Sequence, residues 1–115
     1  MPATSAALEV ENAVQEIFAN TYAYCSYGIT SSRDRTHQQI SLAKSALQSY
    51  RESTVVADSE TLSALDKLLD SVGEHARDCV LMTDEGMTAA EFGNHVVELN
   101  TLRVKTSIAL RNAAR

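Results

Sequence analysis

The three histidines and two cysteines of this chain carry its most reactive side chains. They are His37, His75, His95, Cys25 and Cys79. Imidazole and thiolate bind zinc, copper, nickel and iron, and the cores of helical bundles house such metals or haem. No histidine follows another by three or four residues, and the cysteine spacing matches no zinc motif. A metal or haem site would therefore have to be assembled by the fold from separate segments.

Catalytic signatures are missing from the sequence, and we expect no enzyme. A histidine phosphotransfer domain carries lysine and glycine three and four residues after its histidine, whereas Asp78 and Cys79 follow His75 there. No glycine-rich loop that would cradle a phosphate occurs. The four glycines are isolated at Gly28, Gly73, Gly86 and Gly93.

Helical periodicity fills the chain and predicts an all-α fold. We expect four helices, at 6–27, 32–52, 59–82 and 88–114, with Asp58 or Ser59 capping the third. Gly28 is suited to end the first helix, because glycine adopts the left-handed conformation at little cost. Thr30, Ser31 and Ser32 are expected to cap the second helix, and Thr88 with Glu91 to form a capping box. Residues 53–57 are expected to be extended, and 83–86 to form a turn.

Short connections between helices of similar length predict a single domain, residues 1–115, folded as an antiparallel up-down-up-down four-helix bundle. The alternative is a helical hairpin whose core is completed by dimerisation. The residues expected to point inward are Val10, Val14, Ile17, Phe18, Thr21 and Cys25; Ile40, Ala43, Leu47 and Tyr50; Leu62, Leu65, Leu69, Val72, Ala76 and Cys79; and Phe92, Val96, Leu99, Leu102, Thr106 and Ala109.

In such a bundle the histidines would lie near the end that holds the first and third connections. At about 1.5 Å per residue, His37, His75 and His95 fall within about one helical turn in height. Each is three residues from an expected core residue, and Gly73 and Gly93 at similar heights would permit close helix approach. One functional hypothesis is therefore a metal-, haem- or small-ligand-binding bundle that uses these three histidines. The other reading is that they are half-buried, hydrogen-bonded side chains at the border of the core.

A second functional hypothesis, which we prefer, is a non-enzymatic interaction protein of the adaptor, chaperone or inhibitor type. It would bind a partner protein through helix faces and self-associate, because more apolar residues are present than one stripe per helix needs. The surplus consists of Leu42, Leu68, Val80, Leu81, Val97, Val104, Ile108 and Leu110. The residues expected at the interface are Tyr22, Tyr24, Tyr27, Val104 and Ile108.

Charge limits the classes of partner. The net charge of −5 disfavours nucleic acid, which requires a basic surface. Asp66, Asp70, Glu74 and Asp78 recur every four residues, and their mutual repulsion predicts a basic surface opposite them, either Lys44 and Arg51 of the second helix or another subunit. No apolar run is long enough for a membrane span, and the first residues lack signal-peptide features, so we expect a cytoplasmic protein with buried, reduced cysteines.

Overall fold

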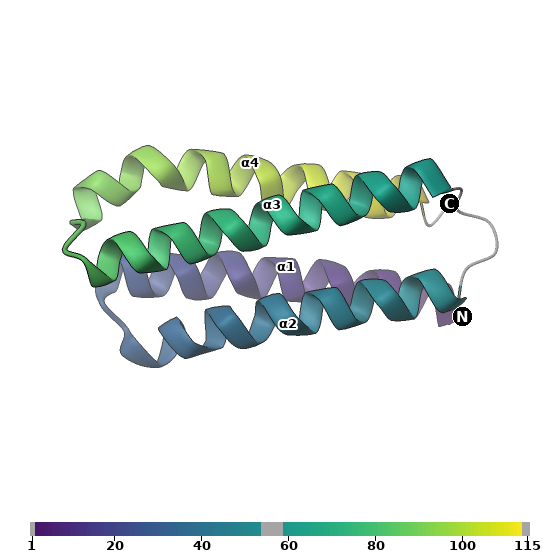
Figure 1. The fold of residues 1–115 in the computed structure, drawn as a ribbon, viewed down its shortest axis with the longest axis horizontal. Helices are drawn as coiled ribbons and strands as arrows, with labels where there is room; N and C mark the ends of the chain where they lie inside the picture. The colour runs from purple at the N-terminus through teal and green to yellow at the C-terminus, as the bar shows by residue number, and fades with distance from the viewer. Residues whose placement is uncertain (1, 54–58, 114–115) are drawn as a thin grey trace.

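Four antiparallel helices make up the part of the chain that the computed structural model describes, residues 2–53 and 59–113 (Figure 1). The helices run up and down alternately, and neighbours in sequence are neighbours in space. This arrangement confirms the predicted all-α, up-down-up-down four-helix bundle. The helices are α1 Pro2–Tyr27, α2 Thr30–Ser53, α3 Ser59–Asp84 and α4 Ala89–Ala113.

Two of the predicted helix ends are formed by the residues expected to form them. Gly28 has a φ of 67°, and its N–H donates a hydrogen bond of 2.9 Å to the carbonyl of Tyr24, which ends α1. The Thr88 Oγ1 accepts a hydrogen bond of 3.2 Å from the N–H of Glu91 and so caps α4. Local chemistry therefore fixes both connections at this end of the bundle.

Other boundaries were predicted too far inside the helices. α1 begins at Pro2 rather than Ala6, since proline is well suited to a first helical turn. α2 begins at Thr30, so Ser32, expected in the cap, is buried within the first turn. α3 continues to Asp84 instead of ending at Met82, and the predicted turn at 83–86 is helical in its first half. Ser53 is the last residue of α2, while the rest of the predicted connection, Asp58 and Ala114 lie outside the described residues.

Helix α1 packs against all three other helices, whereas α2 and α4 do not contact each other among the described residues. The bundle is thus a rhombus in cross-section, with α1 and α3 across its short diagonal. The closest pair is α1 and α2, where Ala13 and Ala46 are buried and let the backbones approach. Every residue predicted to point inward is buried or half-buried.

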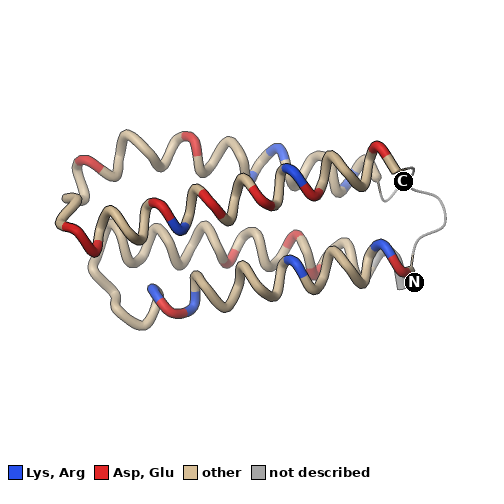
Figure 2. Tube along the Cα trace, viewed as in Figure 1, with Lys and Arg blue, Asp and Glu red and all other residues tan. Residues whose placement is uncertain are grey.

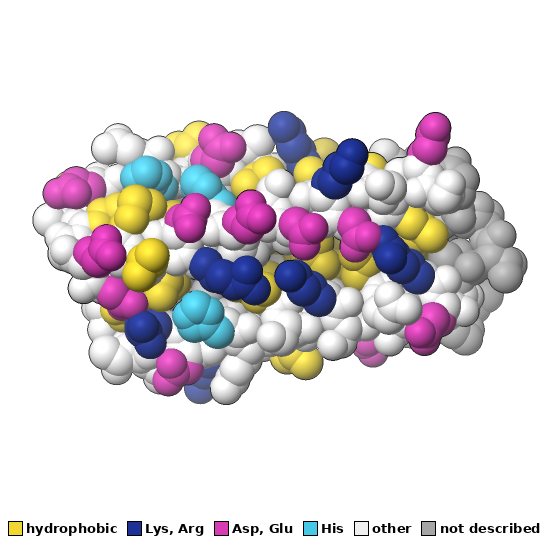
Figure 3. All heavy atoms as spheres, viewed as in Figure 1, with side chains coloured by type: hydrophobic (Ala, Val, Ile, Leu, Met, Phe, Trp, Pro, Cys, Tyr) yellow, Lys and Arg dark blue, Asp and Glu magenta, His cyan; other side chains and the backbone are white. Residues whose placement is uncertain are grey.

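Ion pairs join α2 to the acidic row of α3, which Figure 2 and Figure 3 show running along the helix. Lys44 Nζ lies 3.7 Å from Asp70 Oδ1, and Arg51 pairs with Asp66. Of the two predicted alternatives, the basic surface is therefore the second helix of the same chain. Exposed pairs of this kind are worth little individually, roughly 0–1 kcal/mol, but they relieve the repulsion along α3.

No helix in the described part of the chain is long and apolar enough to cross a membrane.

Candidate functional site

Two of the three histidines lie side by side at the seam between α3 and α4. The ring centroids of His75 and His95 are 6.2 Å apart, and the ring planes are tilted by 51°. The His75 Nε2 is 3.2 Å from the carbonyl oxygen of His95, so a neutral ring protonated at Nε2 donates a hydrogen bond there. Both side chains are half-buried. One ring nitrogen of His75 is thus used structurally and the other is left for further contacts.

A shallow hollow of about 360 Å³ lies beside His95. His95 lines it together with Glu91, one helical turn earlier on the same face of α4. Two thioethers, from Met82 and Met87, contribute to the same wall. The hollow therefore brings one imidazole, two carboxylates (Glu85 and Glu91) and two soft sulfur atoms around an open space.

The third histidine is not part of this group. His37 is exposed and lines a different hollow, of about 250 Å³, with Arg33, Arg77 and Asp84 among its neighbours. In Figure 3, histidine side chains (cyan) lie over the α3–α4 side and again over α2, with basic side chains (dark blue) between the two places. The reason lies in the rhombic packing: His37 is on α2 and His95 on α4, two helices that do not meet. Within the described residues, no three His, Cys, Asp or Glu side chains are placed to hold a metal ion.

The two cysteines are buried thiols, as predicted, with exposures of 4% for Cys25 and 0% for Cys79. The Cys25 Sγ donates a hydrogen bond of 3.5 Å to the carbonyl oxygen of Cys79. Burial raises the pKa of Cys25, and it raises the pKa of Cys79 to about 12. Because the thiolate is the nucleophile and the metal ligand, these protonated thiols serve packing. With Phe92 they form a small second core at this end of the bundle.

A carboxylate at the end of α3 joins three helices. Asp84 accepts hydrogen bonds from Arg33 of α2, at 3.0 Å from Nε and 2.7 Å from Nη2, and a further one from the Tyr24 hydroxyl of α1. The hydrogen bonds from Arg33 and then Tyr24 lower the pKa of Asp84 to about 2. The same carboxylate raises the pKa of Tyr24. Tyr24, predicted at an interface, therefore makes an internal contact that fixes the helix ends.

The other two predicted interface tyrosines face solvent. Tyr22 is 38% exposed and Tyr27 is 71% exposed. The Tyr22 ring lies edge-on to Phe92 of α4, with ring centroids 6.0 Å apart, and contacts Tyr27 at 5.9 Å. Next to it, the Arg103 guanidinium lies 5.2 Å from the ring centroid of Phe18. Aromatic side chains thus seal the seam between α1 and α4 and leave polar edges outside.

The outward face of α4 carries an apolar stripe. Val97 is 68% exposed, Val104 40% and Ile108 53%. The exposed Thr101 lies between them, and its hydroxyl donates a hydrogen bond of 2.8 Å to the carbonyl of Val97. Steps of four, three and four residues place these side chains on one helix face, which we call the α4 outer stripe. The opposite face of α4 holds the core residues Phe92, Leu99 and Leu110.

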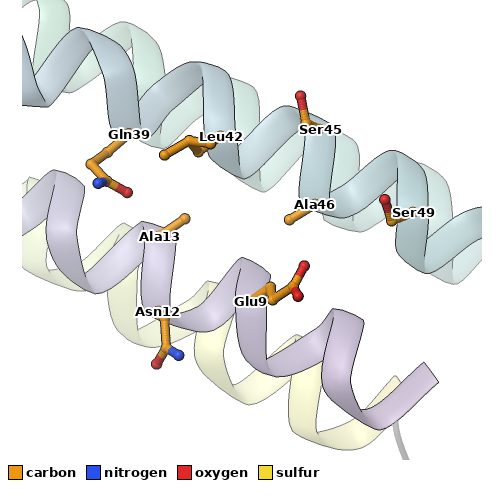
Figure 4. A pocket seen from close by; sticks show the side chains of 8 residues that line it. All are labelled: Glu9, Asn12, Ala13, Gln39, Leu42, Ser45, Ala46 and Ser49. Atoms are coloured by element: carbon orange, nitrogen blue, oxygen red, sulfur yellow. The ribbon is translucent and has the colours of Figure 1, made fainter. Parts of the chain in front are cut away.

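The remaining exposed apolar side chains are scattered over other parts of the described chain. Leu42 borders a shallow groove of about 350 Å³ between α1 and α2, into which Ala13 and Ala46 also point (Figure 4). Leu8, Ile29 and Leu81 are exposed singly. Of the predicted surplus, Val80 and Leu110 are buried and Leu68 is half-buried. Of the surplus apolar residues, those that are exposed therefore form a periodic stripe only on α4.

No family model, no curated protein and no solved structure matches this chain. The α4 outer stripe and the His75–His95 pair are accordingly the two candidate functional sites of the described part of the chain.

Proposed function

We propose that this chain is a non-enzymatic interaction protein that binds a partner protein through helix faces, with the α4 outer stripe as its docking surface. The observation that carries the proposal is the exposure of Val97, Val104 and Ile108 on one face of one helix. Fully burying a side chain of this kind is worth about 1.5–3 kcal/mol. A partner that covers the stripe would recover part of that free energy.

The arrangement of the stripe supports a docking role better than exposure alone does. A bundle helix needs one apolar face, and single exposed apolar residues are ordinary on protein surfaces. Helix α4 has a second apolar face that repeats at helical spacing, the pattern with which helices are recognised by grooves and by other helices. The Thr101 hydroxyl is satisfied by its own helix, so covering it would leave no unpaired donor.

The proposal also covers the location of the protein and the class of its partner. A cytoplasmic location is supported by the two buried free thiols, since reducing compartments keep cysteines in that state. The net charge of −5 supports a protein partner over nucleic acid.

Affinity capture from the native cell with matched variants tests the proposal. Val97→Gln with Ile108→Gln removes two apolar side chains from the stripe and keeps good helix formers. Leu42→Gln with Leu81→Gln makes the same change at exposed positions of α2 and α3. We expect the wild type and the control pair to retain the same partner and the stripe pair to lose it, with all three equally helical by circular dichroism. Equal capture by all three variants would refute the stripe as the docking surface.

A second candidate function is the binding of a transition metal, haem or a small ligand beside His75 and His95. The specific observation in its favour is that His95 lines a hollow together with Met82, Met87 and Glu91, while the His75 ring lies next to the His95 ring. Imidazole and thioether are ligands that copper accepts. Titration with copper, zinc and nickel should then raise the melting temperature of the wild type and of His37→Gln but not of His95→Gln. No thermal shift, no bound metal and no haem absorption band would retire this candidate.

A further inference from the structure

The residue spacing of the α4 outer stripe is the same in both directions along the helix. Its residues are separated by four, three and four positions, so they occupy alternating d and a positions of a heptad: Val97 d, Thr101 a, Val104 d and Ile108 a. When a two-fold axis that passes between Thr101 and Val104 relates two copies of α4, Val97 of one copy pairs with Ile108 of the other. Thr101 of each copy then pairs with Val104 of the other copy. The spacing is therefore self-complementary in the antiparallel orientation.

We propose that a second copy of this chain docks antiparallel on the α4 outer stripe, forming a two-fold symmetric dimer through α4. The inference rests on the proposed function, because it names the occupant of the same surface. A two-fold interface requires one patch that matches itself, and the apolar pairing described above meets that requirement.

Charges beside the stripe support this orientation. Glu98 and Lys105 are exposed and both follow a d position directly, which places them at e positions on one flank. In the antiparallel pair, Glu98 of each copy lies opposite Lys105 of the other, giving two symmetric ion pairs. A parallel pair would place uncharged residues opposite them, because the g positions hold Asn100 and Ser107. The charge pattern thus selects the antiparallel dimer.

Polar residues mark both ends of the stripe. The preceding a position is Asn94 and the following d position is Arg111, whose guanidinium lies 3.0 Å from Glu11 Oε1. The apolar contact is therefore limited to about three helical turns, and an interface of that length falls below the standard size of roughly 1,600 Å². We therefore expect a weak, reversible dimer.

Sedimentation equilibrium with charge-reversal variants tests the proposal. Glu98→Lys and Lys105→Glu each turn two attractive contacts into repulsive ones, so each should raise the dissociation constant roughly three- to tenfold. Combining the two changes exchanges the partners and should restore the wild-type constant. Val97→Gln with Ile108→Gln should abolish dimerisation, and the Leu42→Gln control should leave it unchanged. A wild-type chain that stays monomeric at 1 mM, or a double reversal that is no better than the single ones, would overturn the proposal.

Carbodiimide cross-linking of a mixture of ¹⁴N- and ¹⁵N-labelled protein tests the orientation directly. The expected product joins Glu98 of one isotope to Lys105 of the other, and Glu98→Gln should eliminate it. Mixed-isotope products at other sites only would contradict the antiparallel arrangement. Failure here is distinguishable from failure of the proposed function. A monomeric chain whose capture still depends on Val97 and Ile108 overturns the dimer alone, whereas capture that ignores both residues overturns the docking surface.

Discussion

At the scale of single residues, Asp84 shows how a surface charge can organise a bundle end. It is predicted in a turn, yet it is the last residue of α3 and contacts side chains from α1 and α2. The contact between Asp84 and Arg33 could have been expected from the sequence, since Arg33 lies in the first turn of the second helix and Asp84 lies at the end of the third, at the same end of an antiparallel bundle. The contact of the Tyr24 hydroxyl could not, because its partner depends on how α1 is rotated.

The lowered pKa of Asp84 predicts a specific loss of stability in acid. Because its pKa is about 2 in the folded chain and 3.8 ordinarily, the carboxylate stabilises the fold above pH 4 and loses this effect as pH falls from about 4 to 2. Asp84→Asn should therefore be less stable than the wild type at pH 7, and the difference should shrink toward pH 2. Urea unfolding at both values measures it. An equal difference at both would contradict the assignment of the ion pair with Arg33.

Two glycines make a matched pair for a second prediction. A Cβ on Gly93 would meet nothing within 4 Å, whereas a Cβ on Gly73 would lie 3.3 Å from Ile40 Cγ2. Gly93→Ala should raise the free energy of unfolding by about 0.5–1 kcal/mol, the ordinary gain from replacing glycine within a helix. Gly73→Ala should gain less, because Ile40 has to move. If chemical denaturation gave the two variants equal increases in the free energy of unfolding, Gly73 would not lie at a close approach of α2 and α3.

At the scale of elements, α4 is the helix whose orientation matters most, because it has apolar residues on two faces. Leu99 is fully buried, whereas Val97 is 68% exposed. Leu99→Ala should cost about 2–5 kcal/mol of stability through the cavity it leaves. Val97→Ala should change the stability of the monomer by less than about 0.5 kcal/mol, as surface substitutions usually do. Thermal unfolding of dilute samples measures both, and a large loss in the second variant would mean that the outer stripe is buried.

Helix type and order could be predicted because apolar spacing and turn chemistry act locally. Gly28 and Thr88 formed the expected ends, since their effects depend on the next few residues only. The predicted starts of α1 and α2 and the predicted end of α3 were wrong by two to four residues, because helix ends are less sharply determined by local sequence than helix interiors. Ser32 illustrates this, as it is buried against the bundle instead of exposed in a cap.

At the scale of the whole molecule, the bundle was predictable but its cross-section was not. Helix periodicity says which residues point inward, and the rhombic arrangement then decides which inward residues meet. The prediction that His37 would reach His75 and His95 depended on α2 approaching α4, and these helices do not meet. The internal pairing of α3 with α2 was one of two predicted alternatives, because the neighbouring antiparallel helix supplies the basic residues Lys44 and Arg51.

The docking of a second copy on the α4 outer stripe is the central claim, and methyl-resolved NMR over a dilution series tests it most directly. The methyl signals of Val97, Val104 and Ile108 should shift together as concentration rises through the dimer range, and those of Leu42 and Leu81 should stay fixed. Shifts confined to Leu42 and Leu81, or no shift in any methyl up to 1 mM, would contradict the claim.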